Sequence, residues 1–144
     1  PEVNNNLALI ALKKGKITDA ETFLGKASEA KEVNETMGNL YLAQGQYDRA
    51  VNAFGDAKTN SAALAQILAK DYNKAKSTLD AVENADAYTD YLKAVLGART
   101  NNEDAVISSL RDAISKDRTL ARKASNDLEF AKYFATSGFA NLMR

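Results

Sequence analysis

The chain has 144 residues, of which 45% are hydrophobic and 26% charged, with 19 basic and 19 acidic side chains and no cysteine. This is the composition of a globular domain with a substantial core, and it excludes disulfide and thiolate chemistry. Opposite charges are mixed along the chain, which argues against a nucleic-acid partner, and the longest apolar run, Leu7 to Leu12, is too short to span a membrane.

An internal repeat is the most informative feature of the sequence. The first two copies align without gaps at an offset of 30 residues, which places Gly15 on Gly45. The third copy follows at an offset of 25 residues. The fourth is looser, is carried by Ala105, Leu110 and Ala113, and is expected to contain one extra residue in its second helix. The four copies span residues 6–27, 36–57, 62–82 and 91–114.

Each copy predicts a helix, a tight turn and a second helix. Apolar residues recur at helical spacing up to Gly15, which ends the first helix, and Gly45 repeats this signal in the second copy. Asp71 is expected to cap the second helix of the third copy, and the turn of the fourth is expected around Asn101. The sequence therefore predicts a series of helical hairpins.

Small and bulky residues alternate at fixed places in the predicted second helices. A small residue allows the paired helices to approach closely, and a bulky residue one turn later fills the gap to the next repeat. Each hairpin alone would expose an apolar face, so neighbouring hairpins are expected to stack into a solenoid. The small residues are Ala20, Ala50 and Ala75, and the bulky ones are Leu24, Phe54 and Leu79.

The second copy resembles the tetratricopeptide repeat (TPR), whose pattern includes L-G-x₂-Y followed by A-x₃-F. Met37-Gly38-Asn39-Leu40-Tyr41 matches the first part with Met in place of Leu, and Ala50 to Phe54 matches the second. The resemblance covers residues 3–117. It departs from the family because no repeat opens with tryptophan, the closing proline is missing, and the repeats are shorter than the family period of about 34 residues.

The resemblance implies an all-α, TPR-like superhelix (a solenoid) of about four helical hairpins followed by a helical cap. Aromatic and aliphatic residues of the tail, Phe130, Phe134 and Phe139 among them, are expected to fold back on the last hairpin, because a terminal repeat has no neighbour to cover it. The expected hairpins are residues 3–30, 33–58, 60–83 and 86–117, and the expected cap is 118–144.

The resemblance also implies a concave groove, lined by the first helix of each hairpin, that holds a protein or peptide. Asn6 and Asn39 match positions where the family uses asparagine to bond a ligand's main chain, although asparagine near a helix start, such as Asn5 or Asn6, can equally be a cap. The apolar candidates Leu9 and Leu42 fit the core better than the groove, since periodic apolar residues usually face inward. The candidate groove residues are Asn5, Asn6, Leu9, Lys13, Glu35, Asn39, Leu42, Asp90 and Tyr91.

No catalytic constellation stands out. Histidine and cysteine are absent, and no cofactor or metal is expected. The carboxylate pairs Glu32 with Glu35 and Asp86 with Asp90 have helical spacing, but a solvated helix face explains them better than acid–base chemistry. A clamp for an acidic C-terminal peptide is also not expected, because Thr36 and its counterparts offer no cation and Lys13 alone would not form one.

The sequence thus predicts a non-enzymatic scaffold that binds a protein or peptide partner. Two alternatives remain open: an architectural spacer whose groove is filled by its own tail, and an accessory or regulatory domain of a larger enzyme. The chain begins at Pro1 without an initiator methionine, which suggests a piece of a larger protein. The tail resembles the closing segment of TPR regions in bacterial cell-envelope proteins, which favours a periplasmic location over a cytoplasmic one.

Overall fold

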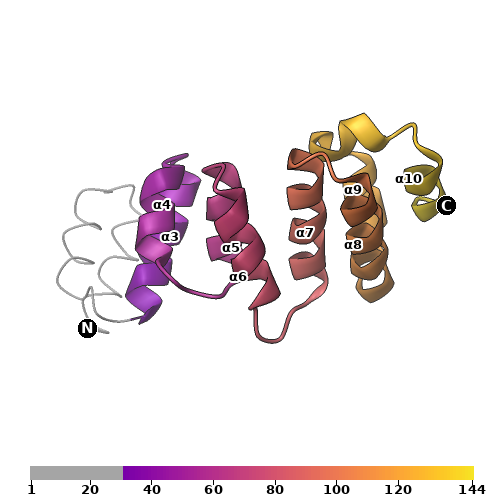
Figure 1. Ribbon diagram of the computed structural model, residues 1–144. Helices are drawn as coiled ribbons and strands as arrows, with labels where there is room; N and C mark the ends of the chain where they lie inside the picture. Colours follow the sequence, from indigo (N-terminus) through magenta and orange to yellow (C-terminus); the bar gives the residue numbers. More distant parts are fainter. Residues whose placement is uncertain (1–30) are drawn as a thin grey trace. The chain divides into compact units, whose positions relative to one another are not determined.

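The computed structural model describes residues 31–144, which are helical and contain no strand (Figure 1). The chain divides into two compact units at the bond between Ala57 and Lys58. The described part of the first unit is one hairpin, made of α3 (Lys31–Ala43) and α4 (Tyr47–Phe54). The all-α class predicted from the sequence is confirmed for residues 31–144.

The second unit contains two hairpins and a tail of short helices (Figure 1). Its first hairpin pairs α5 with α6, and its second pairs α7 with α8. The tail then packs α9 and α10 against α8, and the 3₁₀ helix η1 against α7. The elements are α5 (Asn60–Leu68), α6 (Tyr72–Asp80), α7 (Ala87–Arg99), α8 (Glu103–Lys116), α9 (Thr119–Ser125), η1 (Leu128–Tyr133) and α10 (Ser137–Leu142).

The three described hairpins turn in the same way. Each turn contains one residue with positive φ, which is Gly45 at 73°, Lys70 at 68° and Asn101 at 59°. The amide of the next residue then donates to the carbonyl five residues earlier, over 2.8–2.9 Å. This is the hydrogen bond that closes a helix C-terminus around a left-handed residue. The turns therefore give a common register, with offsets of 25 and 31 residues.

This register shows how the two helices of each hairpin fit together. A small residue of the first helix occupies one shared position, and a bulky residue of the second helix occupies another. In the first unit the small residue is glycine and the bulky one phenylalanine, whereas in both hairpins of the second unit they are alanine and leucine. The small residues are Gly38, Ala63 and Ala94, and the bulky ones are Phe54, Leu79 and Leu110; all six are buried.

The register corrects the expected alignment of the fourth copy. Counted from the turns, the residue equivalent to Ala50 and Ala75 is Val106, which is fully buried, and not Ala105, which is only partly buried. No extra residue is inserted in the second helix. The alignment of the fourth copy from the sequence is one position off, because Ala105 is a small residue like the alanines at the equivalent place in the other copies.

The core of the second unit gathers around α7. One side of α7 packs on α5 and α6, a second on α8, and a third on η1 of the tail. The rings of Tyr91 and Phe130 meet edge to face with centroids 5.5 Å apart, and Phe139 follows at 6.2 Å from Phe130. All three are buried, so the tail closes the apolar surface that the last hairpin would otherwise expose.

Candidate functional site

Three of the expected groove residues lie on one face of α3. Glu35, Asn39 and Leu42 are spaced by four and three residues, which brings their side chains to the same side of a helix. Asn39 is exposed, and Glu35 and Leu42 are partly exposed. Val33 and Leu40 lie on the other side of α3 and are buried. The core thus leaves this face of α3, named here the α3 face, at least partly open.

The side chain of Asn39 forms no hydrogen bond with any residue that the structure describes, nor does it cap a helix, since it lies in the middle of α3. Its amide therefore keeps a donor and an acceptor for a ligand. The other expected groove residues of the N-terminal part, Asn5, Asn6, Leu9 and Lys13, lie outside the described residues.

The same face changes character along the chain. Counted from the turns, the residues of α7 that correspond to Glu35, Asn39 and Leu42 are Tyr91, Val95 and Ala98. In α7 all three positions therefore carry aromatic or aliphatic side chains, whereas two of the three in α3 are polar, and Tyr91 and Val95 are buried. In α5 the corresponding residues are Asn60, Leu64 and Ile67.

Tyr91 is a core residue, which corrects its expected place in an exposed groove. Only 2% of it is exposed, and its hydroxyl donates a 2.6 Å hydrogen bond to Oδ2 of Asp127 in the tail. Burial, together with this carboxylate, raises the pKa of the Tyr91 phenol. Its ring packs against Phe130, so no face of it is free for a partner. At the last hairpin, Phe130 and Asp127 of the tail therefore cover Tyr91.

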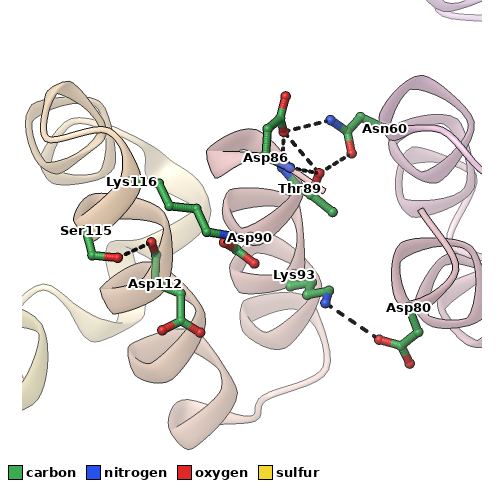
Figure 2. A network of polar contacts seen from close by, with 9 residues as sticks. All are labelled: Asn60, Asp80, Asp86, Thr89, Asp90, Lys93, Asp112, Ser115 and Lys116. Atoms are coloured by element: carbon green, nitrogen blue, oxygen red, sulfur yellow. Dashed lines mark hydrogen bonds and ion pairs between the residues drawn. The ribbon is translucent and has the colours of Figure 1, made fainter. Parts of the chain in front are cut away.

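Asp90 also departs from its expected place. It is 8% exposed, and its Oδ2 lies 2.7 Å from Nζ of Lys116 in α8 (Figure 2). The pair joins the start of α7 to the end of α8, and the Asp90 carboxylate raises the pKa of Lys116. Asp90 precedes Tyr91 by one residue, which rotates its side chain by about 100° toward the partner helix of its own hairpin.

A polar network that the sequence analysis did not anticipate surrounds the N-terminus of α7 (Figure 2). Asp86 accepts a hydrogen bond from the amide of Thr89, and the Thr89 hydroxyl in turn accepts one from the amide of Asp86, which forms a capping box. Asn60 of α5 donates to Asp86 and accepts from Thr89. These bonds lower the pKa of Asp86, chiefly through the Thr89 amide. The network fixes α7 to α5, and the Asp-x-x-Thr spacing was its only sequence signal.

Arg99 holds the tail on α7. Its Nε and Nη2 donate to the two carboxylate oxygens of Glu129 over 2.9 and 2.7 Å, and its Nη1 reaches the carbonyl of Ile67 at 3.4 Å. The two-pronged bond to Glu129 raises the pKa of Arg99. One guanidinium thus ties together α5, α7 and η1, and nothing in the local sequence marks this contact.

Asp86 and Asp90, considered as a carboxylate pair, turn to different partners, since the first caps α7 and the second pairs with Lys116. Within residues 31–144, no three acidic side chains lie close enough together to hold a metal ion. No helix in that range has both the length and the hydrophobicity of a membrane span.

Comparison with known protein families finds a similarity in the N-terminal part of the chain. The tetratricopeptide repeat family model matches residues 1–34 and again residues 32–63. Residues 1–63 are therefore similar to tetratricopeptide repeats, and the TPR-like helical solenoid predicted from the sequence is confirmed as the fold class. Repeats of this kind generally act as scaffolds for protein–protein interaction. No curated protein and no solved structure matches the chain.

Proposed function

We propose that the chain is a non-enzymatic scaffold that binds a protein or peptide partner through the first helices of its N-terminal repeats. The observation that carries this proposal is the α3 face, where an asparagine without a hydrogen-bond partner among the described residues is exposed between a carboxylate and a leucine. The family match to residues 32–63 covers this helix.

The composition of the α3 face supports an extended peptide as ligand. The Asn39 amide can donate to a main-chain carbonyl and accept from a main-chain N–H at the same time. Leu42 adds apolar contact area one turn away, and Glu35 adds a charge at the edge. A mixed surface of this kind is typical of interfaces between proteins that also exist apart.

The C-terminal hairpin supports a different role. Its equivalent positions, Tyr91 and Val95, are buried, and Tyr91 contacts Phe130 and Asp127 of the chain's own tail. We therefore assign partner binding to the N-terminal repeats and an architectural role, closing the solenoid, to α7, α8 and the tail. The proposal thus assigns the scaffold function to the N-terminal repeats and the spacer function to the C-terminal part, which are two of the functions that the sequence left open.

The wider context is part of the same proposal. We infer that the chain is one region of a larger protein of the bacterial cell envelope, supported by the resemblance of its tail to the closing segments of such TPR regions. An accessory role beside a catalytic domain is the alternative. The sequence of the parent gene distinguishes these, because the alternative requires a catalytic domain in the same polypeptide.

A pair of asparagine variants tests the proposed binding face. The intact 144-residue chain, Asn39→Ala and Asn52→Ala are used as baits, and captured proteins are quantified by mass spectrometry. Asn52 is the matched control because it is exposed in the same unit but lies on α4. We expect a partner that the parent chain and Asn52→Ala retain and that Asn39→Ala loses. With the purified partner, Asn39→Ala should raise the Kd about five- to thirtyfold, which is the loss expected for one buried hydrogen bond at an interface.

Equal retention of every partner by the two variants would contradict binding through the α3 face, provided that circular dichroism shows both variants folded. Capture of no partner by the intact chain would favour the architectural role throughout. An enzymatic role would be supported only if the purified parent protein showed an activity that is lost when this region is deleted.

A further inference from the structure

The second unit contains a cavity that is separate from the α3 face. It has a volume of about 260 Å³ and lies among α6, the C-terminal half of α7 and the N-terminal half of α8. Its walls therefore come mainly from the second helices of the two hairpins and not from the face on which a peptide groove is expected. Neither Tyr91 nor Asp90 lines this cavity.

The floor and the rim of this cavity differ in polarity. Leu79 and Leu96 lie in its apolar part, and both are largely buried, so they leave only a small apolar surface facing the cavity. Asn73 of α6 and Ser109 of α8 also line the cavity. Neither of their side chains forms a hydrogen bond with a described residue, which leaves their polar groups available to a ligand.

The charges at the rim favour an anionic ligand. Lys76 and Lys93 both line the cavity, and a single carboxylate, Asp80, lies between them. The Asp80 oxygens are 3.2 Å from Nζ of Lys76 and 3.8 Å from Nζ of Lys93, and the second contact is drawn in Figure 2. Lys76 is 73% exposed and Lys93 36%. One positive charge is therefore left over beside the apolar floor.

The cavity is too small for most cofactors or drug-sized molecules, whose sites have volumes of about 300–1,000 Å³. It is large enough for one aliphatic or aromatic side chain. A single side chain that enters a pocket, surrounded by a polar rim, is the usual anchor of a peptide interaction.

We propose that this cavity is a second docking site, which accepts one apolar side chain of a partner peptide while Lys76 and Lys93 bind an adjacent carboxylate of the same peptide. The anchor side chain contacts Leu79 and Leu96, and Asn73 and Ser109 are placed to bond the peptide main chain. The site does not depend on the α3 face, so the two can be tested separately.

Three small probes separate the two parts of this recognition. N-acetylphenylalanine carries both the ring and the carboxylate, N-acetylphenylalaninamide only the ring, and N-acetylglycine only the carboxylate. Each is titrated into the ¹⁵N-labelled 144-residue chain, and amide shifts are followed by NMR. We expect N-acetylphenylalanine to shift the amides of Gly97, Ala105 and Ser109 in a saturable manner and to bind at least about threefold more tightly than either other probe.

Variants that change the charges at the rim test whether those charges contribute to binding. Lys93→Glu should weaken the binding of N-acetylphenylalanine by about five- to tenfold and leave N-acetylphenylalaninamide unchanged, because only the first carries a charge. Asp80→Asn should strengthen the binding of N-acetylphenylalanine by about two- to threefold, because a competing carboxylate is removed. Arg118→Glu is the matched control, since it makes the same change of charge at an exposed residue that does not line the cavity.

Saturable shifts at these amides with the expected order of probes and variants would support the proposal. It would be overturned by shifts located elsewhere, by equal sensitivity to Lys93→Glu and Arg118→Glu, or by no shift with N-acetylphenylalanine in a chain that is folded by circular dichroism. None of these results bears on the Asn39 experiment, which reports on the other unit.

Discussion

Gly38 of α3 lies directly beneath the ring of Phe54 in α4. A Cβ added at Gly38 would meet Cζ of Phe54 at 2.5 Å, well inside the usual contact distance, and the ring is only 4% exposed. The equivalent pairs in the second unit are Ala63 with Leu79 and Ala94 with Leu110. The size of the small residue therefore follows the size of the side chain opposite it, which keeps the packing of the hairpins dense.

The first prediction concerns this complementarity. Gly38→Ala should lower the free energy of unfolding by about 1 kcal/mol, because overpacking of about 1–3 kcal/mol outweighs the helix propensity gained. Adding Phe54→Leu recreates the alanine–leucine pair of the other hairpins, so the double variant should be more stable than Gly38→Ala. Urea unfolding followed by circular dichroism measures both, and a double variant less stable than either single one would contradict the complementarity.

The second prediction concerns the bond between Tyr91 and Asp127. Tyr91→Phe keeps the ring in the core but removes the 2.6 Å hydrogen bond to a carboxylate, so the free energy of unfolding should fall by about 1.5 kcal/mol. Tyr47→Phe is the control, since the Tyr47 hydroxyl bonds no residue within 31–144, and it should change stability by less than about 0.5 kcal/mol. Equal losses in the two variants would show that the bond adds nothing.

The third prediction concerns the attachment of the tail. Arg99→Lys preserves the charge but loses the two parallel bonds to Glu129, and should cost about 1–3 kcal/mol. Hydrogen exchange should accelerate mainly in residues 127–134, because Arg99 fixes η1. The exposed pair of Lys76 with Asp80 gives the contrast, and Lys76→Gln should cost no more than about 0.5 kcal/mol. Unchanged exchange in the tail of Arg99→Lys would refute the clamp.

The fourth prediction uses the cap of α7. Asp86→Ala should cost about 1 kcal/mol at neutral pH, because Asp86 accepts the hydrogen bond from the Thr89 amide. The pKa of Asp86 is lower in the folded chain than in the unfolded one, so its stabilisation is present above the unfolded pKa of about 3.9 and is lost as pH falls through the lower folded pKa. The difference from the parent should therefore be constant from about pH 7 to pH 5 and shrink below about pH 4.

Asp56→Ala serves as the control for that titration, because Asp56 is exposed and caps no described helix. Thermal unfolding at each pH, read by circular dichroism, provides the stabilities. A difference between the parent and Asp86→Ala that grew on acidification would reverse the expected sign and contradict the role of the ionised cap.

Local sequence was sufficient for the hairpins and their turns. Gly45, Lys70 and Asn101 each follow a run of residues with helical periodicity, and Asp71 caps α6 as expected. These features depend on residues within one or two turns of each other, and such local preferences can be read along a chain. The solenoid class followed because the similar hairpins that the sequence copies predict must cover one another's apolar faces.

The direction in which individual residues of α7 point was decided by the tertiary structure alone. Asp90 and Tyr91 are neighbours in the chain, yet one pairs with Lys116 of α8 and the other with Asp127 of the tail. A displacement of one residue in the repeat alignment rotates a side chain by about 100°, and periodicity cannot detect it in a helix that is apolar on most sides. Arg99 and Glu129 are thirty residues apart, so their contact exists only because the tail folds back on the last hairpin, where an unpaired apolar face would otherwise meet water.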